Sequence, residues 1–151
     1  MFYTGIMIKR IIRDVRREWD YISTLDAYRD DMVQDKPEAL RLYVAVRSDI
    51  LPPLNQGIQA AHAVIELGAN TTIPIDDVET FFTWAQQDKT LILLGANESE
   101  MVQLMSKLRK RSITFATFRE PDLGDVLTAV AILPMTAKTA KDITWGLRRA
   151  E

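Results

Sequence analysis

The sequence predicts an α/β fold, in which helices pack on a β-sheet. Short apolar segments of strand length alternate with longer segments whose apolar residues recur at helical spacing. The 151-residue chain contains no internal repeat and no low-complexity segment. A chain of this length buries roughly 68–70% of its unfolded surface, so it can fold without a metal ion or a disulfide.

The first segment, at about residues 6–32, is expected to form one long amphipathic helix. Ile8, Val15 and Ile22 recur every seven residues on its apolar face, which also allows a seam between two helices and hence a homodimer. Its charged face is basic first and acidic later, the reverse of what the helix dipole favours. We therefore expect packing or a partner to hold this helix.

Pro37 marks the end of this segment, because proline disfavours helical structure in the residue before it. The sequence accordingly predicts an N-terminal helical extension over residues 1–37 and a domain over residues 38–151. A strand is expected at about residues 41–47, where an apolar run ends just before charged and turn residues.

Two helices are expected next. Asn55 is of a residue type favoured at N-caps, and Gly68 is of the type favoured just after a last turn, so they delimit the first helix. Asp76 is expected to cap the second, short helix. The apolar face of that helix contains Val78, Phe81, Phe82 and Trp84.

The second half of the domain is expected to contain three strands and two helices. The strands cover about residues 89–96, 113–118 and 126–133, and the helices cover about residues 98–111 and 138–149. Pro134 is expected to end the last strand, since proline cannot donate a ladder hydrogen bond. A short acidic turn joins the last two strands.

The composition excludes several kinds of site. Without cysteine there is no disulfide, thiolate nucleophile or zinc–thiolate centre, and the single histidine, His62, argues against a multi-histidine metal centre. The net charge of −2 gives no overall attraction to nucleic acid, so an RNA site requires a local basic patch. No apolar run reaches the roughly 18–20 residues of a membrane span, and no secretory signal is present, so we expect a cytoplasmic protein.

The helix after the first strand carries the first group of candidate site residues. Arg47 and Asp49 follow the strand, and Asn55 lies near the helix N-terminus, where α/β proteins bind anions and substrates. Gln59 and His62 are three residues apart and share a helix face. Gln59 can donate to a carbonyl or a ribose hydroxyl, and His62 can transfer protons near neutral pH. A structural interpretation, in which His62 is a core or cap residue, is more common for these residue types.

The acidic turn carries the second group. Glu120 and Asp122 precede Thr128, which opens the last strand. A carboxylate close to a threonine hydroxyl can orient and deprotonate a water for attack on an ester carbonyl. An ordinary turn accounts for the same residues, because Pro, Asp and Gly are turn formers.

Two basic clusters could contact RNA. One is Lys107–Arg111 at the end of its helix, and the other is the first half of the N-terminal helix. Both clusters can also be explained as charged helix faces that are simply solvated. In the first cluster, the helix dipole by itself favours cations, because the cluster lies at the C-terminal end of its helix. Neither cluster interleaves aromatic residues as single-strand binders do.

Taken together, the strand ending in Arg-x-Asp, the Gln-x-x-His-Ala helix and the late Thr-x-Val-Ala-Ile strand resemble the type 2 peptidyl-tRNA hydrolase family, over about residues 41–149. The resemblance implies a three-layer α/β/α fold with a four-stranded mixed sheet. It also implies hydrolysis of the ester between a peptide and the 3′ ribose of tRNA, with peptidyl-tRNA as the partner and no cofactor.

The resemblance also implies site residues. His62 and Gln59 match the histidine and glutamine of the family's helix, Asp49 matches the aspartate after the first strand, and Thr128 matches the threonine of the last strand. Asp122 is the best match for the family's turn aspartate. This makes Asp122, Thr128 and His62 the expected catalytic residues.

The chain departs from the family pattern at one position. The family commonly has Gly-Lys just before the helix, whereas no lysine occurs between Pro52 and Gln56 here. Asn55 is the nearest positional match, Arg47 could compensate for the charge, and Glu120 is the second candidate for the turn carboxylate. The expected substrate-binding residues are Asn55, Gln59, Arg47, Asp49 and Glu120.

Two other functions stay open at this point. A catalytically silent relative would use the same fold to bind tRNA or protein, and it would have an intact pocket without turnover. Alternatively, the N-terminal helix could serve as an oligomerisation or docking arm. Convergence of the predicted residues on one cleft would favour the enzyme.

Overall fold

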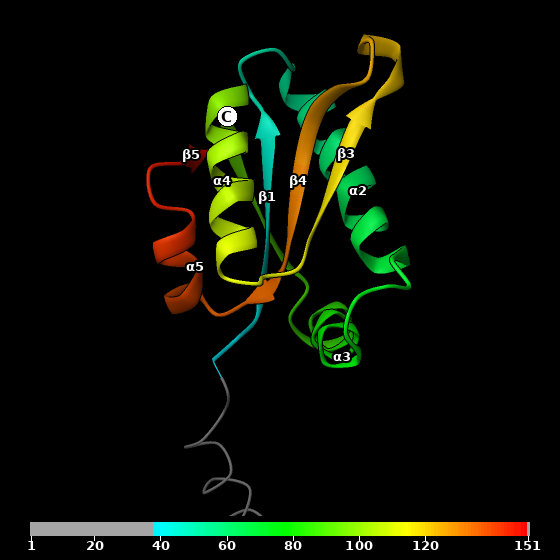
Figure 1. Ribbon diagram of the computed structural model, residues 1–151, viewed down its shortest axis with the longest axis vertical. Helices are drawn as coiled ribbons and strands as arrows, with labels where there is room; N and C mark the ends of the chain where they lie inside the picture. The colour runs from blue at the N-terminus through cyan, green and yellow to red at the C-terminus, as the bar shows by residue number, and fades with distance from the viewer. Residues whose placement is uncertain (1–37, 151) are drawn as a thin grey trace, which may run out of the picture. The chain divides into compact units, whose positions relative to one another are not determined.

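The computed structural model describes residues 38–150. The predicted helix at residues 6–32, with its seam for a second copy, lies outside the described residues. The elements in chain order (Figure 1) are β1 (Arg41–Arg47), α2 (Pro53–Ala69), α3 (Ile75–Thr83), a π-helical turn (Trp84–Asp88), β2 (Thr90–Ala96), α4 (Glu98–Lys110), β3 (Phe115–Glu120), a 3₁₀ turn (Pro121–Leu123), β4 (Val126–Met135), α5 (Ala137–Ile143) and β5 (Arg148–Arg149). None of the described helices has the length and hydrophobicity needed to cross a membrane.

The strands form one mixed sheet in the order β3-β4-β1-β2-β5. β1 and β2 are parallel, whereas β1–β4, β3–β4 and β2–β5 are antiparallel pairs. The predicted α/β class and mixed sheet are confirmed. The predicted number of four strands is wrong for the described part of the chain, because β5 adds a fifth strand.

β5 replaces the end of the predicted last helix. Helix α5 ends at Ile143, and Gly146 then takes φ +92°, a left-handed conformation that ends helical structure. Arg148 and Arg149 pair with Gly95 and Leu94 of β2. A strand of two residues is too short to show an alternation of apolar and polar residues in the sequence. It forms because the free edge of β2 offers backbone hydrogen-bond partners.

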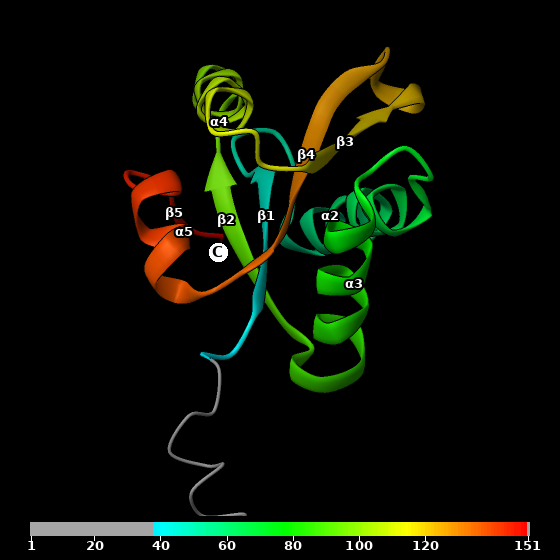
Figure 2. The same ribbon diagram turned by 60° about the horizontal axis from the view of Figure 1, so that its bottom comes forward.

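Helices cover both faces of the sheet, which gives the predicted three layers (Figure 2). On one face, α4 and α5 pack on the strands through Met101, Leu104, Met105, Leu108, Ala140 and Ile143. On the other face, α2 and the π-helical turn pack through Ala60, Ala63, Leu67 and Trp84. The connections that leave β1 and β2 therefore run to opposite faces.

The helix starts differ from two predictions. Pro52 is the N-cap of α2 with Pro53 at the first helical position, and Pro74 is the N-cap of α3, so Asn55 and Asp76 are not capping residues. Proline suits the first turn because its missing N–H would have no helical partner there. Asn97 is the N-cap of α4, where it forms a capping box with Glu100.

Pro134 does not end β4, which continues to Met135. Arg41 pairs with Met135 and Tyr43 with Ile132, so the β4 side has one extra residue at this point. Such a bulge leaves a residue outside the ladder, which lets a strand accept a proline. The position of Pro134 at this irregularity explains why the predicted stop is wrong.

Leu67→Ala is expected to lower the free energy of unfolding by about 2–5 kcal/mol, because Leu67 is fully buried between α2 and the sheet. Urea denaturation followed by circular dichroism measures the change. Ile65→Ala on the same helix is the matched control: Ile65 is 64% exposed, so its loss should cost within about 0.5 kcal/mol. Equal effects of the two changes would contradict the described packing of α2.

Candidate functional site

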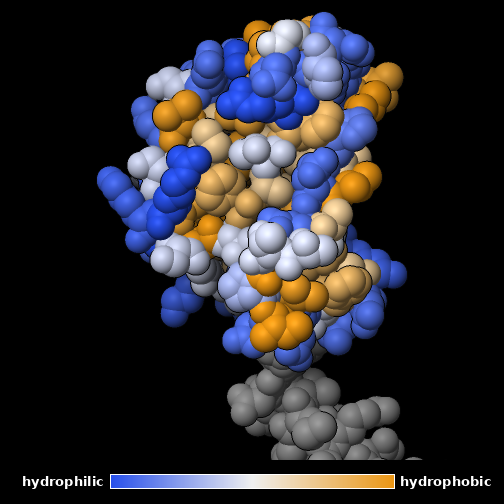
Figure 3. Space-filling model, turned by 45° about the vertical axis from the view of Figure 1, so that its right-hand side comes forward, coloured by the Kyte–Doolittle hydropathy of each residue, from blue (hydrophilic) through white to orange (hydrophobic). Residues whose placement is uncertain are grey.

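The candidate site lies where α2 packs across β4 and the end of β3. Small residues allow this close approach, because four alanines of the two elements share one buried cluster: Ala60, Ala63, Ala129 and Ala131. Figure 3 shows hydrophilic side chains gathered at the upper end of this side of the molecule, at the height of the β3–β4 turn (Figure 1), above a hollow with apolar side chains. Polar groups are thus concentrated at the turn.

Three predicted residues form a hydrogen-bond chain. The hydroxyl of Thr128 donates to Gln59 Oε1 at 2.6 Å, and Gln59 Nε2 donates to Glu120 Oε2 at 2.5 Å. Thr128 and Gln59 are both buried, whereas Glu120 is half-buried. The Thr128 hydroxyl also lies 3.3 Å from the carbonyl oxygen of Phe118. Each buried polar atom of this chain is satisfied, so the arrangement holds the Glu120 carboxylate in place.

His62 lies beside this chain and contacts it through Phe118. The imidazole stacks on the Phe118 ring with 4.4 Å between ring centroids and 12° between planes. His62 itself is exposed, so it is not the buried core residue that the structural interpretation expected. The stacked His62 side chain is therefore accessible to solvent and to a substrate.

The turn that carries Asp122 is closed by its neighbours. Glu120 Oε1 accepts from the backbone N–H of Asp122 at 3.3 Å, and Arg119 donates to the carbonyl of Asp125 at 3.0 Å. Gly124 and Asp125 both have positive φ, +76° and +64°, which tightens the turn. The Asp122 carboxylate is exposed, and no hydrogen bond joins it to Thr128 in the described part of the chain.

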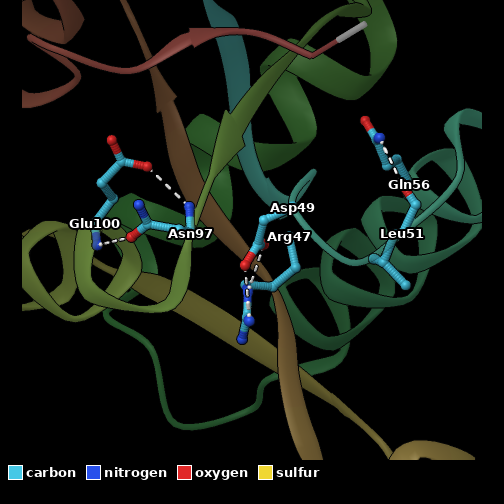
Figure 4. A network of polar contacts seen from close by, with 6 residues as sticks. All are labelled: Arg47, Asp49, Leu51, Gln56, Asn97 and Glu100. Atoms are coloured by element: carbon cyan, nitrogen blue, oxygen red, sulfur yellow. Dashed lines mark hydrogen bonds and ion pairs between the residues drawn. The ribbon is translucent and has the colours of Figure 1, made fainter.

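Arg47 and Asp49 form a second group. The guanidinium donates from Nε to Asp49 Oδ1 at 2.8 Å and from Nη2 to Oδ2 at 3.0 Å (Figure 4). This bidentate hydrogen bond from Arg47 holds the pKa of Asp49 below its ordinary value. The same pairing raises the pKa of Arg47. Arg47 is buried while Asp49 is partly exposed, so the pair presents carboxylate rather than guanidinium to solvent.

A crevice of about 470 Å³ opens beside this pair. It lies at the carboxyl ends of the parallel strands β1 and β2, where the following helices leave to opposite faces, the usual ligand position in α/β sheets. Its polar lining comes from several segments and includes Ser48, Asp49, Gln56, Asn97, Glu100, Arg148 and Arg149. Figure 4 shows the Arg47–Asp49 pair between Asn97 and Glu100 on one side and Gln56 on the other.

Sequence reasoning missed most of these crevice residues. Asn97 directly follows an apolar strand, which is a detectable signal, whereas Arg148 and Arg149 lie in a segment that was predicted to be helical. Asn55 is exposed in the first turn of α2, and its side chain forms no hydrogen bond within the described residues. The structure therefore divides the predicted residues into a turn group and a crevice group.

The basic cluster Lys107–Arg111 contains one buried apolar residue and one cation that packs on an aromatic ring. Leu108 is fully buried against the sheet, and the guanidinium of Arg109 lies over the Phe115 ring, 5.5 Å from its centroid. His, Asp and Glu side chains do not gather in groups of three that could hold a metal ion within the described residues.

The family whose model is described as Peptidyl-tRNA hydrolase PTH2 matches residues 40–150. The chain belongs to this family. No curated protein matches the chain. Among solved structures, a protein of unknown function from Agrobacterium tumefaciens strain C58 is similar with a TM-score of 0.47 and 12% identity, covering 75% of this chain and 98% of its own. The predicted resemblance to the PTH2 family is confirmed.

Thr128→Val is expected to lower the free energy of unfolding by about 1–3 kcal/mol, because it leaves the buried Oε1 of Gln59 without its donor. Thr128→Ser keeps the hydroxyl and is the matched control, with a smaller loss. Thermal and urea unfolding measure both variants. A valine variant as stable as the wild type would contradict the hydrogen-bond chain.

Asp49→Asn is expected to change the pH dependence of stability. The lowered pKa of Asp49 stabilises the fold above the unfolded value of about 3.9, and this contribution is lost as the pH falls through the folded pKa. The wild type should therefore exceed the variant in stability at neutral pH, and the difference should shrink on acidification below about pH 4. Urea denaturation over a pH series measures it, and a constant difference would contradict the pairing.

Proposed function

We propose that the chain hydrolyses the ester that joins a peptide to the 3′ ribose of tRNA. The observation that carries this proposal is the hydrogen-bond chain from Thr128 through Gln59 to Glu120, which joins residues up to 69 positions apart. Gln59 and Thr128 match residues of the family pattern, and Glu120 is the second candidate for the turn carboxylate of that pattern. Membership of the PTH2 family supports the same reaction.

The reaction is an acyl transfer to water. The water oxygen bonds to the ester carbonyl carbon, and the bond from that carbon to the ribose oxygen breaks. A base takes a proton from the water and returns it to the departing ribose oxygen, so the products are a peptide acid and a free 3′-hydroxyl. The site must orient the water and stabilise negative charge on the carbonyl oxygen.

Glu120 is the carboxylate that we assign to the water. Its Oε2 is fixed by the amide of Gln59, and the residue is partly exposed to solvent. Thr128 is a positioning residue in this proposal, because its fully buried hydroxyl reaches the substrate side only through Gln59. A fixed carboxylate loses little entropy when it orients a water, which favours this arrangement for catalysis.

His62 and Asp122 are exposed beside the same turn, so both are open to substrate. We propose that His62 receives from Glu120 the proton taken from the water and passes it to the ribose oxygen. Asp122 is the second candidate base. Asn55 and Asp49 are proposed to bind the tRNA portion of the substrate, and Arg47, which is buried, is proposed to hold Asp49 in position. The extension over residues 1–37, a homodimer and a cytoplasmic location remain predictions.

A catalytically silent relative is the second candidate function. The observation that favours it is the absence of lysine from the start of α2, where Asn55 brings an amide but no charge. Loss of one group that stabilises transition-state charge costs on the order of 10²–10³ in rate. Such a protein would bind tRNA without turnover.

Glu120→Gln is expected to lower kcat for hydrolysis of purified N-acetyl-aminoacyl-tRNA by roughly 10²–10⁴, because the amide cannot accept the proton of the water. The glutamine keeps one of the two acceptor oxygens, so it can still accept from Gln59, and it loses only the exposed hydrogen bond from the Asp122 N–H, so folding should persist. Asp122→Asn is measured beside it, and Glu79→Gln, an exposed carboxylate of α3, is the control with unchanged rate. Circular dichroism checks each variant.

The results separate the candidates. A loss confined to Glu120→Gln supports the assignment, whereas a loss confined to Asp122→Asn moves the base to Asp122. Absence of turnover in well-folded wild type, with tRNA binding retained, would replace the enzyme with the silent relative.

A further inference from the structure

Trp145 is a feature that the proposed function leaves unexplained. Its side chain is 75% exposed between α5 and β5, whereas Trp84 is buried and donates its indole N–H to the carbonyl of Thr90. Gly146 follows in a left-handed conformation, so the chain turns directly after the tryptophan. An exposed flat aromatic surface is a platform on which a nucleic-acid base can stack.

Four cationic side chains lie around Trp145. Lys107 and Lys141 line hollows that Trp145 also lines, and Arg148 and Arg149 follow it in β5. In the described part of the chain, none of these four cations takes part in an ion pair. They are therefore available to an anionic ligand, although the whole chain carries a net charge of −2.

The crevice continues this surface, because Arg148, Arg149 and Gly146 also line it. Its two carboxylates already have partners: Asp49 accepts from Arg47, and Glu100 accepts from the backbone N–H of Asn97 at 2.8 Å. A carboxylate has about four acceptor sites, so both can accept further hydrogen bonds. The lining of the crevice thus offers carboxylates that can accept from hydroxyl groups and arginines that can bind phosphates.

We propose that the segment Trp145–Arg149 and the crevice together bind single-stranded RNA, at a surface separate from the Thr128–Gln59–Glu120 chain. Trp145 stacks on a base, Arg148 and Arg149 bind phosphates, and the carboxylates of the crevice accept hydrogen bonds from ribose hydroxyls. The inference rests on the proposed function only for the identity of the physiological RNA, a tRNA.

The surroundings favour RNA over a protein or DNA ligand. The hollow between Trp145 and α4 is lined in part by Glu100, Gln103 and Lys107, whereas the centre of a protein interface is depleted of charged residues. The hydroxyl acceptors of the crevice distinguish ribose from deoxyribose, because only ribose has a 2′-hydroxyl. The lining of this surface therefore predicts that the ligand is a nucleic acid and that its sugar is ribose.

Fluorescence anisotropy with a labelled oligouridylate of roughly 12 nucleotides tests this surface in the full chain. Trp145→Ala should weaken the affinity by about 5- to 100-fold, and Trp145→Phe should restore most of it, since loss of one base stack accounts for the change. An oligodeoxyuridylate of the same length should bind more weakly than the ribonucleotide.

Arg148→Ala combined with Arg149→Ala should reduce the slope of log affinity against log salt by about 1.4, that is, about 0.7 for each lost phosphate contact. Arg41→Ala combined with Lys138→Ala is the matched control. It also removes two exposed cations, but at the opposite end of β1, so the slope should stay unchanged.

Equal affinity of Trp145→Ala and wild type, equal affinity for the two oligonucleotides, or no binding by wild type would each overturn the inference. Hydrolysis of N-acetyl-aminoacyl-tRNA is measured in parallel. Wild type that binds through Trp145 but hydrolyses nothing leaves the inference standing and removes the proposed function. If the wild type hydrolyses the substrate and Trp145→Ala binds the oligouridylate as tightly as the wild type does, the proposed function stands and the inference is overturned.

Discussion

The close approach of α2 to β4 is the constraint on which the candidate site depends. Alanines on both elements leave no room for larger side chains, so Thr128 and Gln59 are enclosed together with the apolar cluster. Buried polar groups need partners, because an unsatisfied one costs about 1–3 kcal/mol. Thr128 therefore satisfies Gln59, and the remaining donors of Gln59 point to Glu120. The packing of the helix and the position of the carboxylate have one physical cause.

The arrangement of strands creates the second polar region. β1 and β2 are parallel neighbours, and the chain leaves them toward opposite faces of the sheet, so their carboxyl ends border an opening. Arg47 lies at this edge with its charge buried, and Asp49 compensates that charge through two hydrogen bonds. The short strand β5 then brings Arg148 and Arg149 to the same opening. Arg148 and Arg149 lie near Asp49 and Glu100 there without forming an ion pair with either carboxylate.

Individual elements show what limited the prediction of the fold. Long periodic segments such as α4 were predicted within about one residue at each end, since their apolar faces determine them locally. Asn55 was wrong as a cap because Pro53, already in the first turn, starts α2 earlier. Pro134 was wrong as a stop because a bulge in β4 absorbs it. In these cases a nearby residue or the pairing of strands outweighed the structural preference that the residue type has by itself.

The sequence by itself determined the α/β class, the succession of most helices and strands, and the residue types of the site. It did so because hydrophobic periodicity and turn chemistry act over a few neighbouring residues. Only the tertiary structure decided that Glu120 is the carboxylate joined to Gln59, and that Asp49, which is paired with Arg47, lines the crevice, whereas Thr128 is buried beside Gln59. These relations join residues far apart in the chain. They depend on strand order and on the contact of α2 with β4, which no local pattern contains.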